Sequence, residues 1–165
     1  MTKRFRSFAE AEKADRDLYK KLTGNERLRI MAKLLNHEPE QRLERVSRII
    51  KLPGVDYVIV GAHSLALHGR PRYTGDLDIL VRSTPENARM LVAILSEFGF
   101  AASGFKESDF LKAEQLIQLG RAPTRIALLT SISGVSNEEA FASKVSAELD
   151  GILVSVLGKD AFARG

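Results

Sequence analysis

Cysteine is absent from this 165-residue chain, and long apolar runs are absent as well. Without cysteine there is no disulfide framework, no thiolate metal site and no cysteine nucleophile, which is compatible with a reducing, intracellular setting. No apolar run approaches the roughly 20 residues that a membrane helix requires. Residues 1 to 17 also lack the apolar segment of a secretory signal. These absences predict a soluble cytoplasmic protein without a membrane partner.

Positive charge is concentrated in the N-terminal third of the chain. The net charge is +4, yet residues 1 to 51 carry 14 Lys and Arg against 8 Asp and Glu, a net of +6, and the remainder is negative. A basic arm of this kind can contact nucleic acid, but a solvated helix face gives the same count. Because the length corresponds to about one domain, we predict a basic helical arm over residues 1–51 and one domain over residues 52–165.

Helical patterns fill the arm. Residues 5–22 are highly charged with few apolar positions, and two clearer helices follow, one after Asn25 as its cap and one with Pro39 in its first turn. Their apolar residues repeat at helical spacing: Leu28, Met31, Leu34 and Leu35 in the first, and Leu43, Val46, Ile49 and Ile50 in the second. Pro53-Gly54 then ends the helical third.

Strand patterns begin after Gly54. Strands are predicted at 56–60, 76–81, 114–120 and 124–132, and a hairpin of two further strands over 144–156. Helices are predicted at 62–68, 85–99 and 137–143. Gly69 can end the first helix, Asn137 is expected to cap the third, and Asp150-Gly151 suits a type I′ turn. The sum is an α/β (α+β) domain with a mixed sheet of about five strands, preceded by helices.

Two carboxylates interrupt the apolar strand 76–81. Alternation puts Asp76 and Asp78 on one face, about 6.6 Å apart along the strand, and Leu77 and Ile79 on the other. A divalent cation would relieve the repulsion between the two carboxylates, and hard oxygen ligands without cysteine or clustered histidine favour Mg²⁺ or Mn²⁺. A strand end where both side chains simply reach water is the alternative.

Gly61 lies where the first strand turns into the first helix of the domain. A missing side chain lets a ligand approach the backbone, and free N–H groups at a helix start can hold a phosphate. Ser64 can add a hydroxyl donor. A lone glycine here is commonly only a turn, but a phosphate cradle followed by a carboxylate pair is what a metal-bound nucleoside triphosphate needs.

The stretch "GAHS" at 61–64 and "HGRPRYTGDLDILV" at 68–81 resembles the active-site signature of the polymerase-beta-type nucleotidyltransferase superfamily, in the small branch related to AbiEii toxins. The likeness covers roughly residues 50 to 160. It implies a minimal nucleotidyltransferase fold, in which Asp76 and Asp78 are catalytic and hold two Mg²⁺ ions. Gly61, Ala62 and Ser64 would hold the phosphates of a nucleoside triphosphate.

The resemblance has one marked departure. Members of the family carry a third carboxylate on a neighbouring strand, and the matching position here is Ala127. A methyl group can neither hold a metal ion nor take a proton, so we expect nucleotide binding to survive better than turnover. Asp109 and Glu114 are substitute carboxylates to consider. Alanine is also an ordinary strand residue.

Basic residues near this stretch have two interpretations each. Arg72 either neutralises a triphosphate or pairs with a nearby carboxylate and shapes the loop. For Arg70 the second of these roles is favoured. Arg125 and Lys144 are expected on exposed strands, where substrate contact is an option.

Two functions are therefore carried forward. The first is transfer of a nucleoside monophosphate from a triphosphate to a hydroxyl of RNA or protein, impaired by Ala127. The second is a non-catalytic, partner-binding or regulatory module of the toxin–antitoxin type on the same fold. A weaker third idea is direct nucleic-acid binding by residues 1–51, which would be steeply salt-dependent.

Overall fold

The computed structural model describes most of the chain from residue 54 onward and one helix before it. The described residues are 17, 19–35, 54–70, 72, 74, 76–120, 125–149 and 151–162, without the side chains of 31–35 and 162. The predicted helix after Pro39, most of the predicted helix at 5–22, the turn at 121–123 and Asp150 of the hairpin lie outside them.

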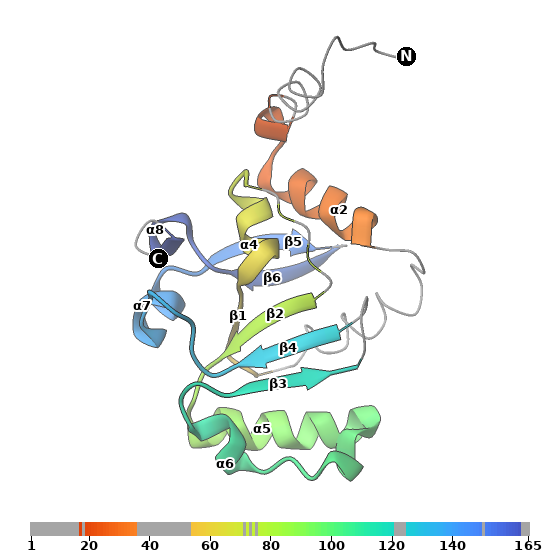
Figure 1. Ribbon diagram of the computed structural model, residues 1–165, viewed down its shortest axis with the longest axis vertical. Helices are drawn as coiled ribbons and strands as arrows, with labels where there is room; N and C mark the ends of the chain where they lie inside the picture. Colours follow the sequence, from red (N-terminus) through yellow and green to blue (C-terminus); the bar gives the residue numbers. More distant parts are fainter. Residues whose placement is uncertain are drawn as a thin grey trace.

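A six-stranded mixed sheet forms the centre of the molecule (Figure 1). Its spatial order is β3-β4-β2-β1-β6-β5. β2 runs parallel to β4, and β1 parallel to β6, whereas the other neighbouring pairs are antiparallel. The strands are β1 (Tyr57–Ile59), β2 (Asp76–Val81), β3 (Leu116–Leu119), β4 (Arg125–Leu129), β5 (Val145–Leu149) and β6 (Ile152–Val156). The predicted α/β class with a mixed sheet is confirmed, and each of the six strands lies within a predicted strand or the predicted hairpin, against an expected total of about five.

Helices cover both faces of the sheet. The helices are α2 (Gly24–Leu35), α4 (Gly61–Leu67), α5 (Pro85–Leu95), α6 (Glu107–Leu111), α7 (Asn137–Ala142) and α8 (Lys159–Phe162). A π turn (Ser96–Phe100) and a 3-10 turn (Ala101–Ser103) extend α5. The predictions did not include α6 and α8, which are too short to show a helical period.

Alternation along the strands divides the core in two. Ile79 and Leu77 pack in one cluster with Leu91 of α5, whereas Leu80 packs in another with Phe141 of α7. Residues 76 and 78 share the face of Leu80 because side chains repeat every second residue. This second face therefore becomes polar toward the start of β2.

Two predicted helix caps were wrong by one or two residues. The N-cap of α7 is Ser136, whose hydroxyl accepts a hydrogen bond from the Glu139 N–H, and not Asn137. Before α2, the Thr23 hydroxyl accepts from the Glu26 N–H, and the Glu26 carboxylate accepts from the Thr23 N–H. Both are reciprocal capping boxes, in which a glutamate three residues on selects the cap. Asn25 instead accepts a hydrogen bond from the Glu148 N–H of β5.

α2 packs against the domain, although it belongs to the predicted arm. Leu28 is 1% exposed and joins the cluster that contains Leu67 of α4. The Arg27 guanidinium donates to the Leu67 carbonyl at 3.1 Å and to the backbone carbonyls of Tyr19 and Lys20. The described part of the arm is thus tied to the domain by apolar burial and hydrogen bonds.

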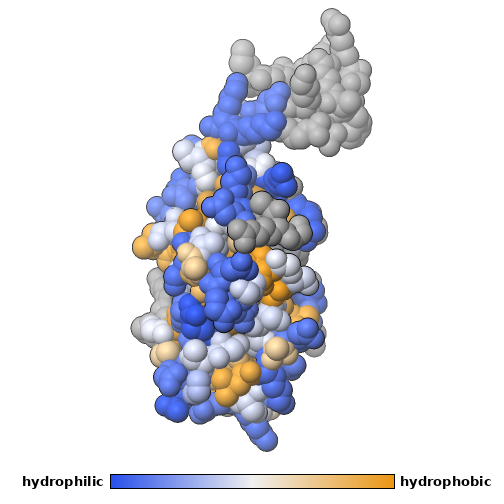
Figure 2. Space-filling view, turned by 90° about the vertical axis from the view of Figure 1, so that its left-hand side faces the viewer, coloured by the Kyte–Doolittle hydropathy of each residue, from blue (hydrophilic) through white to orange (hydrophobic). Residues whose placement is uncertain are grey.

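The side of the molecule that carries α7 and α8 is largely hydrophilic (Figure 2). Apolar residues appear there in small groups separated by polar ones. Among the helices that the structure describes, none has the length and apolar character needed to cross a bilayer.

Candidate functional site

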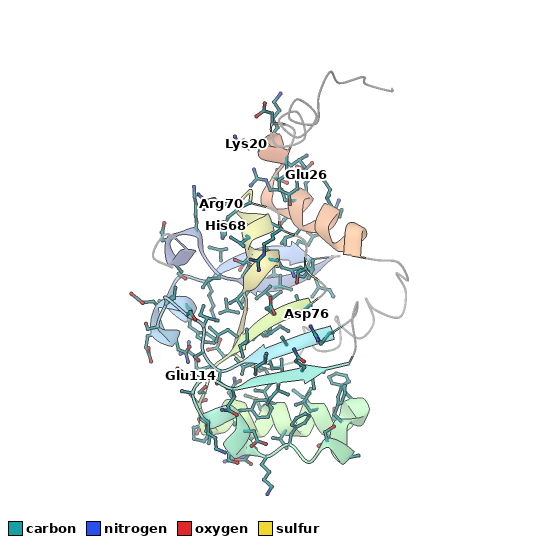
Figure 3. All side chains as sticks on the ribbon, in the orientation of Figure 1. Lys20, Glu26, His68, Arg70, Asp76 and Glu114 are labelled. Carbon is teal, nitrogen blue, oxygen red and sulfur yellow. The ribbon has the colours of Figure 1, made fainter. Side chains whose placement is uncertain are left out.

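The two carboxylates of β2 lie on one face of the sheet, as alternation predicts. Leu77 and Ile79 are each 2% exposed on the opposite face, whereas Asp76 and Asp78 are half-buried. Asp76 stands at the first position of β2, at the end of the strand that leads in from the loop after α4 (Figure 3). The pair therefore borders solvent at the polar end of the second face.

Gly61 lies directly against the Asp78 side chain. Its backbone has φ +63°, and a Cβ at this position would overlap the Asp78 carboxylate. The preceding residue, Val60, donates its N–H to the Asp78 carbonyl at 3.0 Å, which fixes the turn beside β2. Glycine is required here for two reasons: the left-handed conformation and the room for the carboxylate.

The neighbouring strand β4 places Ala127 directly beside Asp78. The parallel register pairs Asp78 with Ala127 and Asp76 with Arg125, so all four side chains share one face. Gln118 of β3 pairs with Ala127 from the other side and is exposed. Ala127 is 3% exposed, and its methyl group offers no ligand atom.

Arg125 binds Asp76 through both oxygens. Its Nε donates to Oδ1 at 2.8 Å and its second terminal nitrogen to Oδ2 at 2.6 Å. A fork of two parallel charge-assisted bonds is the strongest arrangement available to a carboxylate and a guanidinium. The sequence placed Arg125 on an exposed strand, but it did not reveal this ion pair, because the pairing depends on the β2–β4 register.

Asp78 lies in a different electrostatic setting. Burial, and next the negative charge of Asp76, raise the pKa of Asp78, while the positive charges of Arg72 and Arg125 lower it in part. In the described part of the chain no hydrogen-bond donor reaches its carboxylate. An added cation would therefore stabilise the ionised form of Asp78.

The other residues that the sequence predicted for the site differ in burial and in distance from the carboxylates. Ala62 is fully buried, so only its backbone can contact a ligand. Ser64 is also fully buried and donates its hydroxyl hydrogen to the Leu157 carbonyl at 3.0 Å, so a role on phosphate would require it to move. Arg72 is exposed and close enough to affect Asp78. Arg70 lies at the far end of α4, away from Asp76 (Figure 3).

Neither substitute carboxylate lies at the site. Asp109 belongs to α6, where its side chain accepts a hydrogen bond from the Lys106 N–H. Glu114 lies beyond the end of β4, where its N–H donates to Ser131, far from Asp76 (Figure 3). Lys144, which sequence considered for substrate contact, pairs with Asp56 at 3.0 Å.

The donor set fits a single divalent cation better than two. Carboxylate oxygens are suitable ligands for Mg²⁺ or Mn²⁺, and the charges of Arg72 and Arg125 offset only part of the pKa increase of Asp78. However, both oxygens of Asp76 are engaged by Arg125, and the third position is an alanine. Among the described residues no group of three or more His, Cys, Asp or Glu side chains could hold a metal ion.

Comparison with known proteins gives one structural likeness. A crystal structure of a "putative nucleotidyltransferase" from Thermotoga maritima shares 22% sequence identity, covers 76% of this chain and 83% of its own, and superposes with a TM-score of 0.49. No protein-family model matches the chain. No curated protein matches it either.

Proposed function

We propose that this chain is a nucleotidyltransferase-like protein that binds a nucleoside triphosphate together with Mg²⁺ or Mn²⁺. The observation that carries the proposal is the contact between Gly61 and the Asp78 carboxylate, which puts an acidic group against a bare backbone turn. The sequence resemblance of residues 61–81 supports the same assignment. Asp78 would hold the ion beside the Asp76 carboxylate, which Arg125 holds in place, and the backbone of Gly61 and Ala62 with Arg72 would face the phosphates.

The reaction would be transfer of a nucleoside monophosphate to a hydroxyl of RNA or protein. The hydroxyl oxygen forms a bond to the α-phosphorus, the bond to the β-phosphate oxygen breaks, and pyrophosphate leaves. A bound divalent ion supplies charge neutralisation for the phosphates. The hydroxyl proton needs a base, and Ala127 cannot supply one. General-base help contributes about 10² to 10⁴ in rate, or roughly 3 to 5 kcal/mol, so turnover should be impaired more than binding.

A non-catalytic, partner-binding or regulatory module of the toxin–antitoxin type is the second candidate. Two observations favour it. Arg125 neutralises the Asp76 carboxylate, and an alanine occupies position 127, where the resemblance expects a third carboxylate. This candidate predicts a binding partner and no effect of nucleotide on the melting temperature.

Calorimetric titration with ATP, GTP, CTP and UTP in the presence of Mg²⁺ tests the binding proposal. We expect heat from at least one nucleotide, abolished by Asp78→Asn. Heat near baseline for all four, or heat that Asp78→Asn leaves unchanged, contradicts the proposal and favours the module.

Transfer itself is tested with labelled triphosphates against total RNA and cell protein. Ala127→Asp restores the missing carboxylate beside Asp78, so we expect it to increase labelling about 10²-fold or more over the wild-type chain. Ala127→Asn is the matched control, since it adds similar bulk without a base. Equal labelling by both variants would show that the missing carboxylate is not the defect.

A further inference from the structure

Arg125 places a fixed positive charge on Asp76, which is one of the two carboxylates that the sequence resemblance assigns to metal ions. Its guanidinium is forked onto Asp76, and the two side chains are only 34% and 21% exposed. Because both oxygens of Asp76 accept hydrogen bonds from Arg125, a metal ion can reach them only by displacing the guanidinium or by sharing the carboxylate with it.

Before a nucleotide binds, the charge balance of the site disfavours a second divalent ion. Two such ions bring four positive charges, whereas Asp76 and Asp78 supply two negative ones and Ala127 none. Arg125 adds a fifth positive charge. At about 5 Å from a guanidinium, a divalent ion loses about tenfold in affinity even at the dielectric constant of water. By contrast, a single ion at Asp78 together with Arg125 leaves the nucleotide-free site with a net charge of only +1, because the two carboxylates offset two of the three positive charges.

We infer that Arg125 takes the place of the second cation, so that this chain, before a nucleotide binds, holds one divalent ion, at Asp78, and not two. The inference rests on the proposed function, because it concerns the same site. Ala127 and Arg125 then have a common explanation. Where the third carboxylate is missing, the metal ion that it would bind is replaced by the Arg125 guanidinium, two residues away on the same strand. Arg125 would act as a positioning residue for Asp76 and as a fixed positive charge facing the phosphates.

Mn²⁺ titration of the full chain tests this inference, with free Mn²⁺ followed by its electron paramagnetic resonance signal. We expect one Mn²⁺ per wild-type chain, lost in Asp78→Asn. Arg125→Gln removes the guanidinium charge and frees Asp76, so its affinity for Mn²⁺ should rise about tenfold. Arg89→Gln is the charge-matched control: Arg89 is 68% exposed on α5, beyond the opposite face of the sheet. Its affinity should match the wild-type value.

Arg125→Lys separates charge from hydrogen-bond geometry. It keeps the positive charge and should stay within about threefold of the wild-type affinity. An increase in Mn²⁺ affinity as large as that of Arg125→Gln would overturn the inference.

Two Mn²⁺ ions per wild-type chain, or no gain in affinity in Arg125→Gln over Arg89→Gln, would also overturn it while leaving the proposed function intact. If Arg125→Gln does not fold, the wild-type count decides. Absence of Mn²⁺ binding, or binding unaffected by Asp78→Asn, overturns the proposed metal site and this inference together.

Discussion

Gly61 and Asp78 form the closest link in the site at the scale of single residues. The glycine combines a left-handed backbone with a carboxylate where its side chain would be. Neither feature alone is unusual, since Gly99 also has a positive φ with open space around it. Their combination makes the position sensitive to one added methyl group.

Gly61→Ala should lower the melting temperature by roughly 5 °C or more. Left-handed strain costs on the order of 1–3 kcal/mol, displacement of Asp78 adds to it, and each kcal/mol corresponds to about 2–4 °C for a chain of this size. Gly99→Ala is the control, because it carries the strain without the clash. Thermal unfolding followed by circular dichroism gives both values. Equal losses in the two variants would mean that the Asp78 contact adds nothing.

Asp78→Asn should stabilise the chain at neutral pH. Burial and Asp76 raise the pKa of Asp78 in the folded state, so its ionised form destabilises the fold above that pKa. This penalty disappears below the ordinary value of about 3.9, where folded and unfolded chains are both protonated. The gain in melting temperature, a few degrees at pH 7, should therefore vanish as the pH falls.

Asp56→Asn is the control of opposite sign. Burial raises the pKa of Asp56, but hydrogen bonds and charges of Arg82 and Lys144 lower it by more than burial raises it. The net effect is a lowered pKa. Its stabilising effect is present above the ordinary value and is lost as the pH falls through the folded-state pKa. The variant should lose stability at pH 7. The same direction of change in both variants would contradict these assignments.

At the scale of elements, α2 differs most from the sequence prediction, which placed it in the basic arm, because the structure packs it against the domain. Leu28 lies in the core, whereas Ile30 on the same helix is 36% exposed. Hydrogen bonds from Arg27 to the Leu67 carbonyl and from the Glu148 N–H to Asn25 join α2 to α4 and β5. A helix held in this way stabilises the sheet behind it.

Leu28→Ala should destabilise the whole chain by about 2–5 kcal/mol, as truncation of a buried leucine does. The matched variant Ile30→Ala should cost less than about 1 kcal/mol, because much of its side chain already contacts water. Chemical denaturation measures both. If Leu28→Ala leaves the midpoint of the main transition unchanged, α2 does not contribute to the stability of the domain.

At the scale of the whole molecule, the mixed sheet brings three separate segments to one place. The turn at Gly61, the start of β2 and the start of β4 meet because β2 lies between β1 and β4. A ligand that bridges them would stabilise the folded state as a unit.

Saturating Mn²⁺ should accordingly raise the melting temperature. Binding at ten times the dissociation constant contributes about 1.4 kcal/mol, which corresponds to a shift of roughly 3–5 °C. Scanning calorimetry of the wild-type chain and of Asp78→Asn with and without Mn²⁺ measures it. A shift of the same size in Asp78→Asn would assign the effect to another part of the chain.

Local patterns in the sequence were sufficient for most of the domain. Apolar runs and period-two alternation predicted the strands, and the spacing of Asp76 and Asp78 placed them on one face. Pro85 marked the start of α5, but the helix ends at Leu95, and Gly99 lies in the π turn that follows. The caps were misplaced because Asn25 and Asn137 are good cap residues in isolation. The capping-box spacing of Thr23 with Glu26 and of Ser136 with Glu139 is present in the sequence and would have located both caps.

The sequence by itself determined the alternation of β2, the bare turn at Gly61 and the lack of a carboxylate at Ala127, since each depends on residues close together in the chain. The tertiary structure alone decided that Arg125 pairs with Asp76, that the Ser64 hydroxyl donates to Leu157, and that Asp109 and Glu114 lie elsewhere. These contacts depend on strand register and helix packing. Register is a collective result of burying one face of every strand, and no short stretch of sequence contains it.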